Sequence, residues 1–421
     1  MEYAFSLTHQ RMSIRFALCL TAWLPALSCA MGPATFDAIA EGYVRASLRL
    51  AQHDPSLVED WRGPASWRPG PRVPVAQLLD EIADLERRLS VARSDISSTQ
   101  DYVRGQYLAA QVQALRFSAE RQLGRATSID EQARDEFGVT FSRVDQSRID
   151  AALASLNRLL PGDRPLHERV ATFRRDIVVP VERREDVLVA AGIPCMHAIN
   201  AVVPILMDEG APPTLRDNLE WDAFARFDGD RTTTIEINNG PLDVARVMRL
   251  ICHEGFGGHH TQYVWINQIS RKRDWLELQL TPGFGPHLLI TEGAAEVAAD
   301  VILTRQEREA LLRDRLLPLA GLAPSLAPTI FEVDALLIAL LPVVTDVARQ
   351  YLDGTINRER AIARLTDEAL LTNPEGTLAF IERRRARALV YGEGRRIVHD
   401  AIKTKDLAGL YAAFKAVAAV Q

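Results

Sequence analysis

The chain has 421 residues, of which 47% are hydrophobic, so it is long enough for one large or two ordinary domains with a sizeable core. Its formal charge of −6 at pH 7 comes from interspersed acidic and basic residues and leaves no basic patch of the kind that binds nucleic acid. A peptide or small molecule is a more consistent partner.

The first thirty residues look like a secretory signal peptide. Arg11 and Arg15 precede an apolar run at 16–27, and Ser28-Cys29-Ala30 offers a small-residue cleavage site. The apolar run is too short to span a bilayer, so we expect no integral membrane span. We expect residues 1–30 to be removed and the protein to be periplasmic or secreted. The alternative is a start near Met31 and a cytoplasmic protein.

Apolar residues recur at helical spacing through most of the rest of the chain. The predicted helical segments are 36–51, 74–123, 146–160, 305–354 and 357–419. One segment, 232–238, is β-branched and alternating and predicts a strand, which 239–241 ends. No long linker interrupts 31–421. We therefore expect a single, mainly α domain with one small β-sheet, built as two helical lobes around a cleft.

Two cysteines would remain after cleavage of the signal peptide. These are Cys195 and Cys252, and one pair does not make a disulfide framework. Cys252 directly precedes His253 in a predicted helix, so we expect it in the core. A weaker alternative is that its thiol binds a metal.

Three of the nine histidines fall within the run His-Glu-Gly-Phe-Gly-Gly-His-His at 253–260. Histidine nitrogens and a carboxylate are the usual ligands of a catalytic zinc ion, and metallopeptidases carry their general base directly after the first histidine. That residue is Glu254 here. The spacing differs from the common HExxH arrangement, in which one helical face carries two histidines four residues apart.

One straight helix cannot build this site. His253 and His260 would stand roughly 10 Å apart at about 1.5 Å per residue, too far for one ion. The three glycines between 255 and 258 weaken a helix interior and permit positive φ. The sequence therefore predicts a helix over 241–252, a break at the glycines, and a second helix over 260–269.

A third candidate ligand lies on a helix predicted over 288–303. Glu292, Glu296 and Asp300 recur every four residues along one face of this otherwise apolar segment. A buried carboxylate is costly unless a metal or a hydrogen bond compensates it. We assign Glu292 to the metal, and Glu296 to a supporting position beside a metal-bound imidazole.

The run from His253 to His260 resembles the HEGxPGHH signature of the bacterial family called domain of unknown function 885, whose members resemble gluzincin-type zinc peptidases. Further stretches of the chain share the resemblance, at 43–67, 135–138, 159–162 and 235–238. It covers nearly the whole chain from about residue 36. Gly257 stands where the family usually has proline, and we expect glycine to loosen this turn while adopting the same conformation.

The resemblance implies that His253 and one of the two later histidines bind one Zn²⁺ ion, with Glu292 as the third ligand and Glu254 as the general base. Relative to a four-residue spacing, His259 needs the smaller insertion. We therefore assign His259 to the metal and His260 to a supporting position. The alternative is that His260 replaces it as the ligand.

The resemblance also suggests residues that meet the substrate. Tyr391 resembles a tyrosine-glycine motif near the family's carboxy terminus, and we expect it to stabilise the oxyanion. Arg395, or else Arg387, is a candidate for binding a substrate carboxylate.

In gluzincin-like folds an edge strand pairs with the extended substrate backbone. If the strand at 232–238 does so, Asn238 and Asn239 contact the substrate. The alternative is that both asparagines only form the turn after the strand.

Together these features predict a zinc-dependent hydrolase, a peptidase or amidohydrolase acting on a peptide or small amide. Zinc would activate water and polarise the substrate carbonyl, and Glu254 would take the water proton and pass it to the leaving group. Two alternatives stay open. One is a hydrolase that tailors a small metabolite or natural product, and the other is a helical binding protein whose site is inactive.

Overall fold

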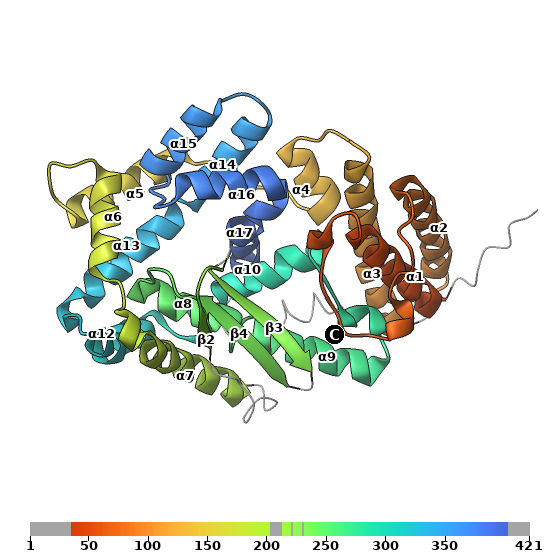
Figure 1. The fold of residues 1–421 in the computed structure, drawn as a ribbon, viewed down its shortest axis with the longest axis horizontal. Coiled ribbons are helices and arrows are strands. Elements are labelled where there is room, and N and C mark those ends of the chain that lie inside the picture. The colour runs from red at the N-terminus through yellow and green to blue at the C-terminus, as the bar shows by residue number, and fades with distance from the viewer. Residues whose placement is uncertain (1–34, 97, 203–212, 220–221, 230, 403–421) are drawn as a thin grey trace, which may run out of the picture. The chain divides into compact units, whose positions relative to one another are not determined.

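The computed structural model describes residues 35–96, 98–202, 213–219, 222–229 and 231–402. The predicted signal peptide at 1–30 and the predicted helical residues after 402 lie outside this part. Most described residues lie in α-helices, and two small β-sheets complete the fold (Figure 1). The predicted mainly α class is therefore confirmed, with two small sheets in place of the one expected.

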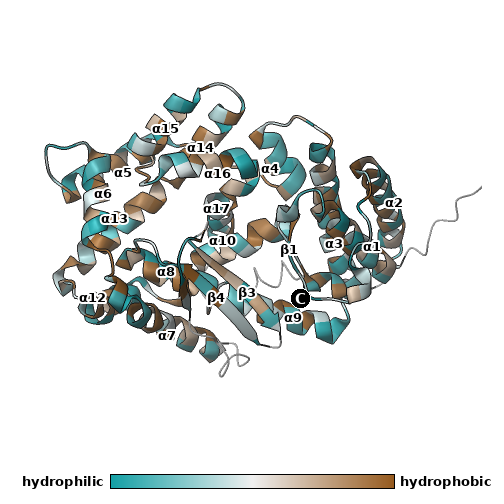
Figure 2. Cartoon of the chain, viewed as in Figure 1, coloured by the Kyte–Doolittle hydropathy of each residue, from teal (hydrophilic) through white to brown (hydrophobic). Residues whose placement is uncertain are grey.

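Within the described residues, seven α-helices precede the larger sheet. In chain order they are α1 (Phe36–Ala51), α2 (Val75–Ser94), α3 (Thr99–Gln122), α4 (Ile129–Phe137), α5 (Gln146–Leu159), α6 (Leu166–Asp176) and α7 (Arg184–Val202). Apolar residues recur along one face of α2 and polar residues along the other, as in an amphipathic helix (Figure 2). Tyr43, Leu78 and Leu108 are fully buried where α1, α2 and α3 pack together. The predicted helix at 74–123 is two helices, because Ser98 caps the start of α3.

In the part of the chain up to residue 402, ten α-helices follow the larger sheet. They are α8 (Val244–Glu254), α9 (His259–Arg273), α10 (Gly285–Ile302), α11 (Arg305–Leu311), α12 (Leu317–Ala320), α13 (Ala327–Ala339), α14 (Leu341–Leu352), α15 (Arg358–Asp367), α16 (Pro374–Arg384) and α17 (Val390–Ala401). The segment predicted as helical at 305–354 is therefore interrupted. Gly321 ends α12 in the left-handed conformation, and Pro324 follows it.

The larger sheet has the strand order β2-β4-β3, formed by β2 (Thr214–Arg216), β3 (Ala223–Gly229) and β4 (Thr232–Asn238). β4 is the predicted strand, but it is paired on both sides, parallel to β2 and antiparallel to β3. The expectation that it is an edge strand free to pair with substrate is therefore wrong. Among the described strands, β2 and β3 form the two edges of this sheet, and Ala223, Phe224 and Ala225 of β3 line the main cavity.

The smaller sheet joins β1 (Val58–Trp61) to β5 (Leu280–Pro282), far apart in the chain. It fixes the segment after α1 against the loop that leads into α10. Gly283 lies so close to this segment that a Cβ there would overlap the carbonyl oxygen of Ser56.

Helix α10 is the central element around the site. Its neighbours include α3, α8 and α17. Ala294 and Ala298 pack into the core formed with α7 and α8, whereas Leu289 packs into the core of α4 and α14. Among the described helices, none is long and apolar enough to cross a membrane.

A disulfide bond joins Cys195 on α7 to Cys252 on α8. Both cysteines are fully buried, as expected for Cys252. The alternative that the Cys252 thiol binds a metal is wrong, because its sulfur is already bonded.

Candidate metal centre

The histidine-rich run folds as a break between two helices. α8 ends at Glu254 and α9 begins at His259. At the break the chain turns back onto the end of α8, so that a Cβ on Gly258 would overlap the carbonyl oxygen of His253. The predicted break is confirmed. It brings His253 and His259 closer together than one continuous helix would.

Gly257 has φ +100° in this turn, and its N–H donates to Thr261 Oγ1 at 2.9 Å. Proline holds φ near −65°, so it could not adopt this conformation. Gly257 therefore does not take the conformation of the family's usual proline here. The chain uses a turn that requires glycine.

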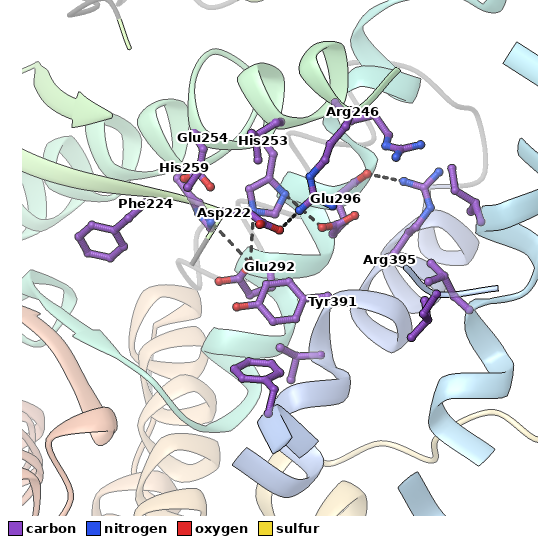
Figure 3. A pocket seen from close by; sticks show the side chains of 18 of the residues that line it. Asp222, Phe224, Arg246, His253, Glu254, His259, Glu292, Glu296, Tyr391 and Arg395 are labelled. Atoms are coloured by element: carbon purple, nitrogen blue, oxygen red, sulfur yellow. Dashed lines mark hydrogen bonds and ion pairs between the residues drawn. The ribbon is translucent and has the colours of Figure 1, made fainter. Parts of the chain in front are cut away.

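The turn brings three predicted ligands together. His253 Nε2 lies 3.4 Å from Glu292 Oε2, and His259 Nε2 lies 3.6 Å from the same oxygen (Figure 3). The three donor atoms lie within 4.8 Å of one another. The two imidazole planes are nearly perpendicular, at 85°. His259 therefore occupies the position beside His253 and Glu292, as the sequence analysis assigned it.

The donor set fits one zinc ion. A tetrahedral ion with bonds of about 2.1 Å separates its ligand atoms by about 3.4 Å, which agrees with the two distances to Glu292 Oε2. That oxygen is buried and accepts no hydrogen bond in the described part of the chain. A buried carboxylate oxygen without a partner is costly, and a cation at this point would compensate it.

Neighbouring side chains orient both imidazole rings. His253 Nδ1 faces Glu296 Oε1 at 3.4 Å, and His259 Nδ1 faces Gln262 Oε1 at 3.3 Å. Gln262 is itself held by a hydrogen bond from its amide to the carbonyl of Thr291. Gln262 can accept a hydrogen bond from His259 Nδ1, and Glu296 forms an ion pair on the Nδ1 side of His253, so each Nε2 faces the oxygen of Glu292. Glu296 lies where the sequence placed it.

The charges of the site agree with this arrangement. Burial opposes ionisation of Glu292, but the two histidines hold its pKa well below the usual range. Burial also opposes protonation of His259, yet the negative charge of Glu292 raises its pKa to about 10. Burial raises the pKa of Glu254. A carboxyl group with a raised pKa is a better proton acceptor at neutral pH.

His260 lies apart from the three ligands. Its Nδ1 is 2.8 Å from Thr233 Oγ1, and its ring packs edge-on against Phe256. Burial lowers its pKa to about 4, so it is neutral at pH 7. His260 does not line the main cavity.

Tyr391 stands beside Glu292 at the start of α17 (Figure 3). The negative charge of Glu292, and then burial, raise the pKa of the Tyr391 hydroxyl well above its usual value. This hydroxyl keeps its proton and faces the cavity, so it can donate a hydrogen bond.

The predicted substrate-binding residues take other positions. Arg395 lines the cavity, but its guanidinium group donates to the Asp300 carboxylate and to the carbonyl of Glu296. Asn238 donates to the carbonyl of Leu219, and Asn239 donates to Asp217. Neither asparagine lines the cavity. Arg387 does line it but pairs with Glu136.

The structure adds two residues that the sequence analysis missed. Tyr263 stacks on the ring of His259, and its hydroxyl donates to the carbonyl of Ala225 at 3.3 Å. Glu59 on β1 lines the cavity beside His259 and Glu292. Nothing in the local sequence marks Glu59, because its position depends on pairing with β5 more than two hundred residues later.

The ligands open into a cavity of about 1020 Å³. One wall is β3 and α8, and the others come from the segment 55–59, from α13, and from α16 and α17. Part of the lining is apolar and includes Val333, Leu337 and Leu371. A cavity of this size accommodates a short peptide.

No family model matches the chain, and no curated protein matches it. Several solved structures resemble it distantly. A carboxypeptidase of the M32 family from Deinococcus radiodurans R1 has a TM-score of 0.47 and 14% identity over 91% of this chain and 87% of its own. A protein from Colwellia psychrerythraea, described as a candidate lipoprotein, has a TM-score of 0.45 and 15% identity over 84% of this chain and 70% of its own. At this distance neither likeness assigns an activity to the chain.

Proposed function

We propose that this chain is a zinc-dependent hydrolase that cleaves peptide bonds or other amide bonds. The observation that carries the proposal is the convergence of His253, His259 and Glu292 on one point, with the buried carboxyl group of Glu254 beside them. The resemblance of the run at 253–260 to the HEGxPGHH signature supports the same class.

His253 and His259 would hold the ion through Nε2, and Glu292 through Oε2. When bound, zinc acidifies water and polarises a carbonyl group, which is the chemistry that amide hydrolysis requires. Glu254 directly follows a ligand and would accept the proton of the attacking water and pass it to the leaving amine. Tyr391 would donate a hydrogen bond to the carbonyl oxygen as negative charge develops there.

The substitution Glu254→Gln tests this proposal. We expect a folded protein that still binds zinc but hydrolyses peptides and amides about 10²- to 10⁴-fold more slowly, because the proton acceptor is lost. Activity is measured on a panel of peptides, small amides and esters at equal zinc content. Glu182→Gln is the matched control, because Glu182 is exposed and outside the cavity. Unchanged activity in Glu254→Gln would contradict the proposal.

We also propose that the protein is exported from the cytoplasm. Disulfide bonds persist in oxidising compartments outside the cytoplasm, and the structure contains one between Cys195 and Cys252. Fractionation of cells that express the full chain, with the mature amino terminus sequenced, separates export from a start near Met31.

A further inference from the structure

Glu59 is the extra residue of a β-bulge. β1 and β5 pair through Val58 with Pro282 and through Asp60 with Thr281, so the register shifts at Glu59. Bulges redirect a side chain and are frequent beside active sites. This bulge leaves Glu59 on the lining of the cavity, next to His259 and Glu292, and on the lining of a small recess of about 20 Å³ beside it.

The Glu59 carboxylate has no hydrogen bond or ion pair anywhere in the described residues. Solvent reaches the Glu59 side chain through the cavity. Protein atoms nevertheless surround its carboxyl group, and this burial raises its pKa to about 7, with a further contribution from the negative charge of Glu292.

The charges around Glu59 leave it without a counter-ion. Glu292 and Glu254 would balance a divalent ion, so Glu59 would remain as an additional negative charge. The positive charge of Arg384 also acts on it, but the two form no ion pair in the described residues. A positively charged group of the substrate would fill this role, because a charged partner stabilises a partly desolvated carboxylate.

We propose that Glu59 binds the free α-ammonium group at the amino terminus of a peptide substrate. This inference rests on the proposed function, since it places the substrate carbonyl at the zinc ligands. Glu59 lines the same recess as His259 and Glu292, and both of these residues act electrostatically on its carboxyl group. The α-ammonium group is two bonds from the carbonyl carbon of the first residue and therefore lies close to the ligands when that carbonyl does. The ammonium group of a lysine side chain would lie farther away.

Binding measurements on zinc-loaded Glu254→Gln protein test the proposal without turnover. The probes are L-leucinamide, N-acetyl-L-leucinamide and N-acetyl-L-lysinamide, which carry an α-ammonium group, no ammonium group and a side-chain ammonium group. By calorimetry we expect L-leucinamide to bind roughly 10- to 100-fold more tightly than its acetylated form, as for loss of a charged hydrogen bond. Adding Glu59→Gln should abolish this difference, whereas adding Glu182→Gln should preserve it.

Three results would overturn the proposal: equal binding of both leucine amides, a difference that survives Glu59→Gln, or preference for the lysine amide. Zinc content is measured in every variant, so loss of the metal is not mistaken for loss of recognition. Hydrolysis by the protein with Glu254 intact separates the two proposals. Equal cleavage of free and acetylated peptides would refute the role of Glu59 alone, whereas no cleavage of any amide would refute the proposed function.

Discussion

The histidines of this chain differ in charge because their surroundings differ. Carboxylates beside His253 and His259 raise the pKa of both rings despite burial. His287, in the first turn of α10, has no such neighbour, and burial lowers its pKa to about 4. Among the described residues, its ring has a polar contact only with the Tyr107 hydroxyl, at 3.4 Å. A helix amino terminus also disfavours positive charge.

His287 should therefore make the folded protein sensitive to acid. Its folded pKa lies below the unfolded value of about 6.5, so its contribution is fully present above pH 6.5 and is lost as the pH falls towards 4. Between pH 7.5 and pH 5 we expect the free energy of unfolding to fall by about 2 kcal/mol more in the wild type than in His287→Gln. Urea titrations of both proteins at the two pH values measure this change in the free energy of unfolding.

The exposed His399 provides the control, since His399→Gln should behave as the wild type does. An equal loss of stability in His287→Gln and the wild type would show that this ring does not carry the effect.

At the scale of elements, the crossing of α10 and α17 places Tyr391 beside Glu292. The two helices meet at Gly293 and Gly394, where the backbones are in contact. A Cβ on Gly394 would overlap the carbonyl oxygen of Leu289. Small residues at this crossing are therefore required for the geometry of the site.

Alanine substitutions in α17 test this crossing. Gly394→Ala should lower the free energy of unfolding by about 1–3 kcal/mol, because the helices must move apart. Gly392→Ala is a matched control in the same helix, since a Cβ there would meet only Leu341 at 3.8 Å. It should be neutral or stabilise by up to about 1 kcal/mol, because alanine favours helix more than glycine does. Equal effects in urea unfolding would contradict the account of the crossing.

At the scale of the whole molecule, local patterns predicted more than long-range pairing did. Apolar periodicity predicted α1 within its observed bounds, and the glycines predicted the break before His259. The sequence could not show that β2, with three residues, covers one side of β4. Nor could it place Glu59, because that depends on pairing between β1 and β5. Each of these failures concerns contacts between distant segments, which periodicity does not encode.

The central claim is that His253, His259 and Glu292 hold one zinc ion. The most direct test is the zinc content, by mass spectrometry, of the reconstituted wild type, His259→Ala and His260→Ala, with helix content checked by circular dichroism. The account predicts one zinc per chain in the wild type and in His260→Ala, and almost none in folded His259→Ala. A wild type without zinc, or a His260→Ala variant that loses zinc while His259→Ala keeps it, would contradict the account.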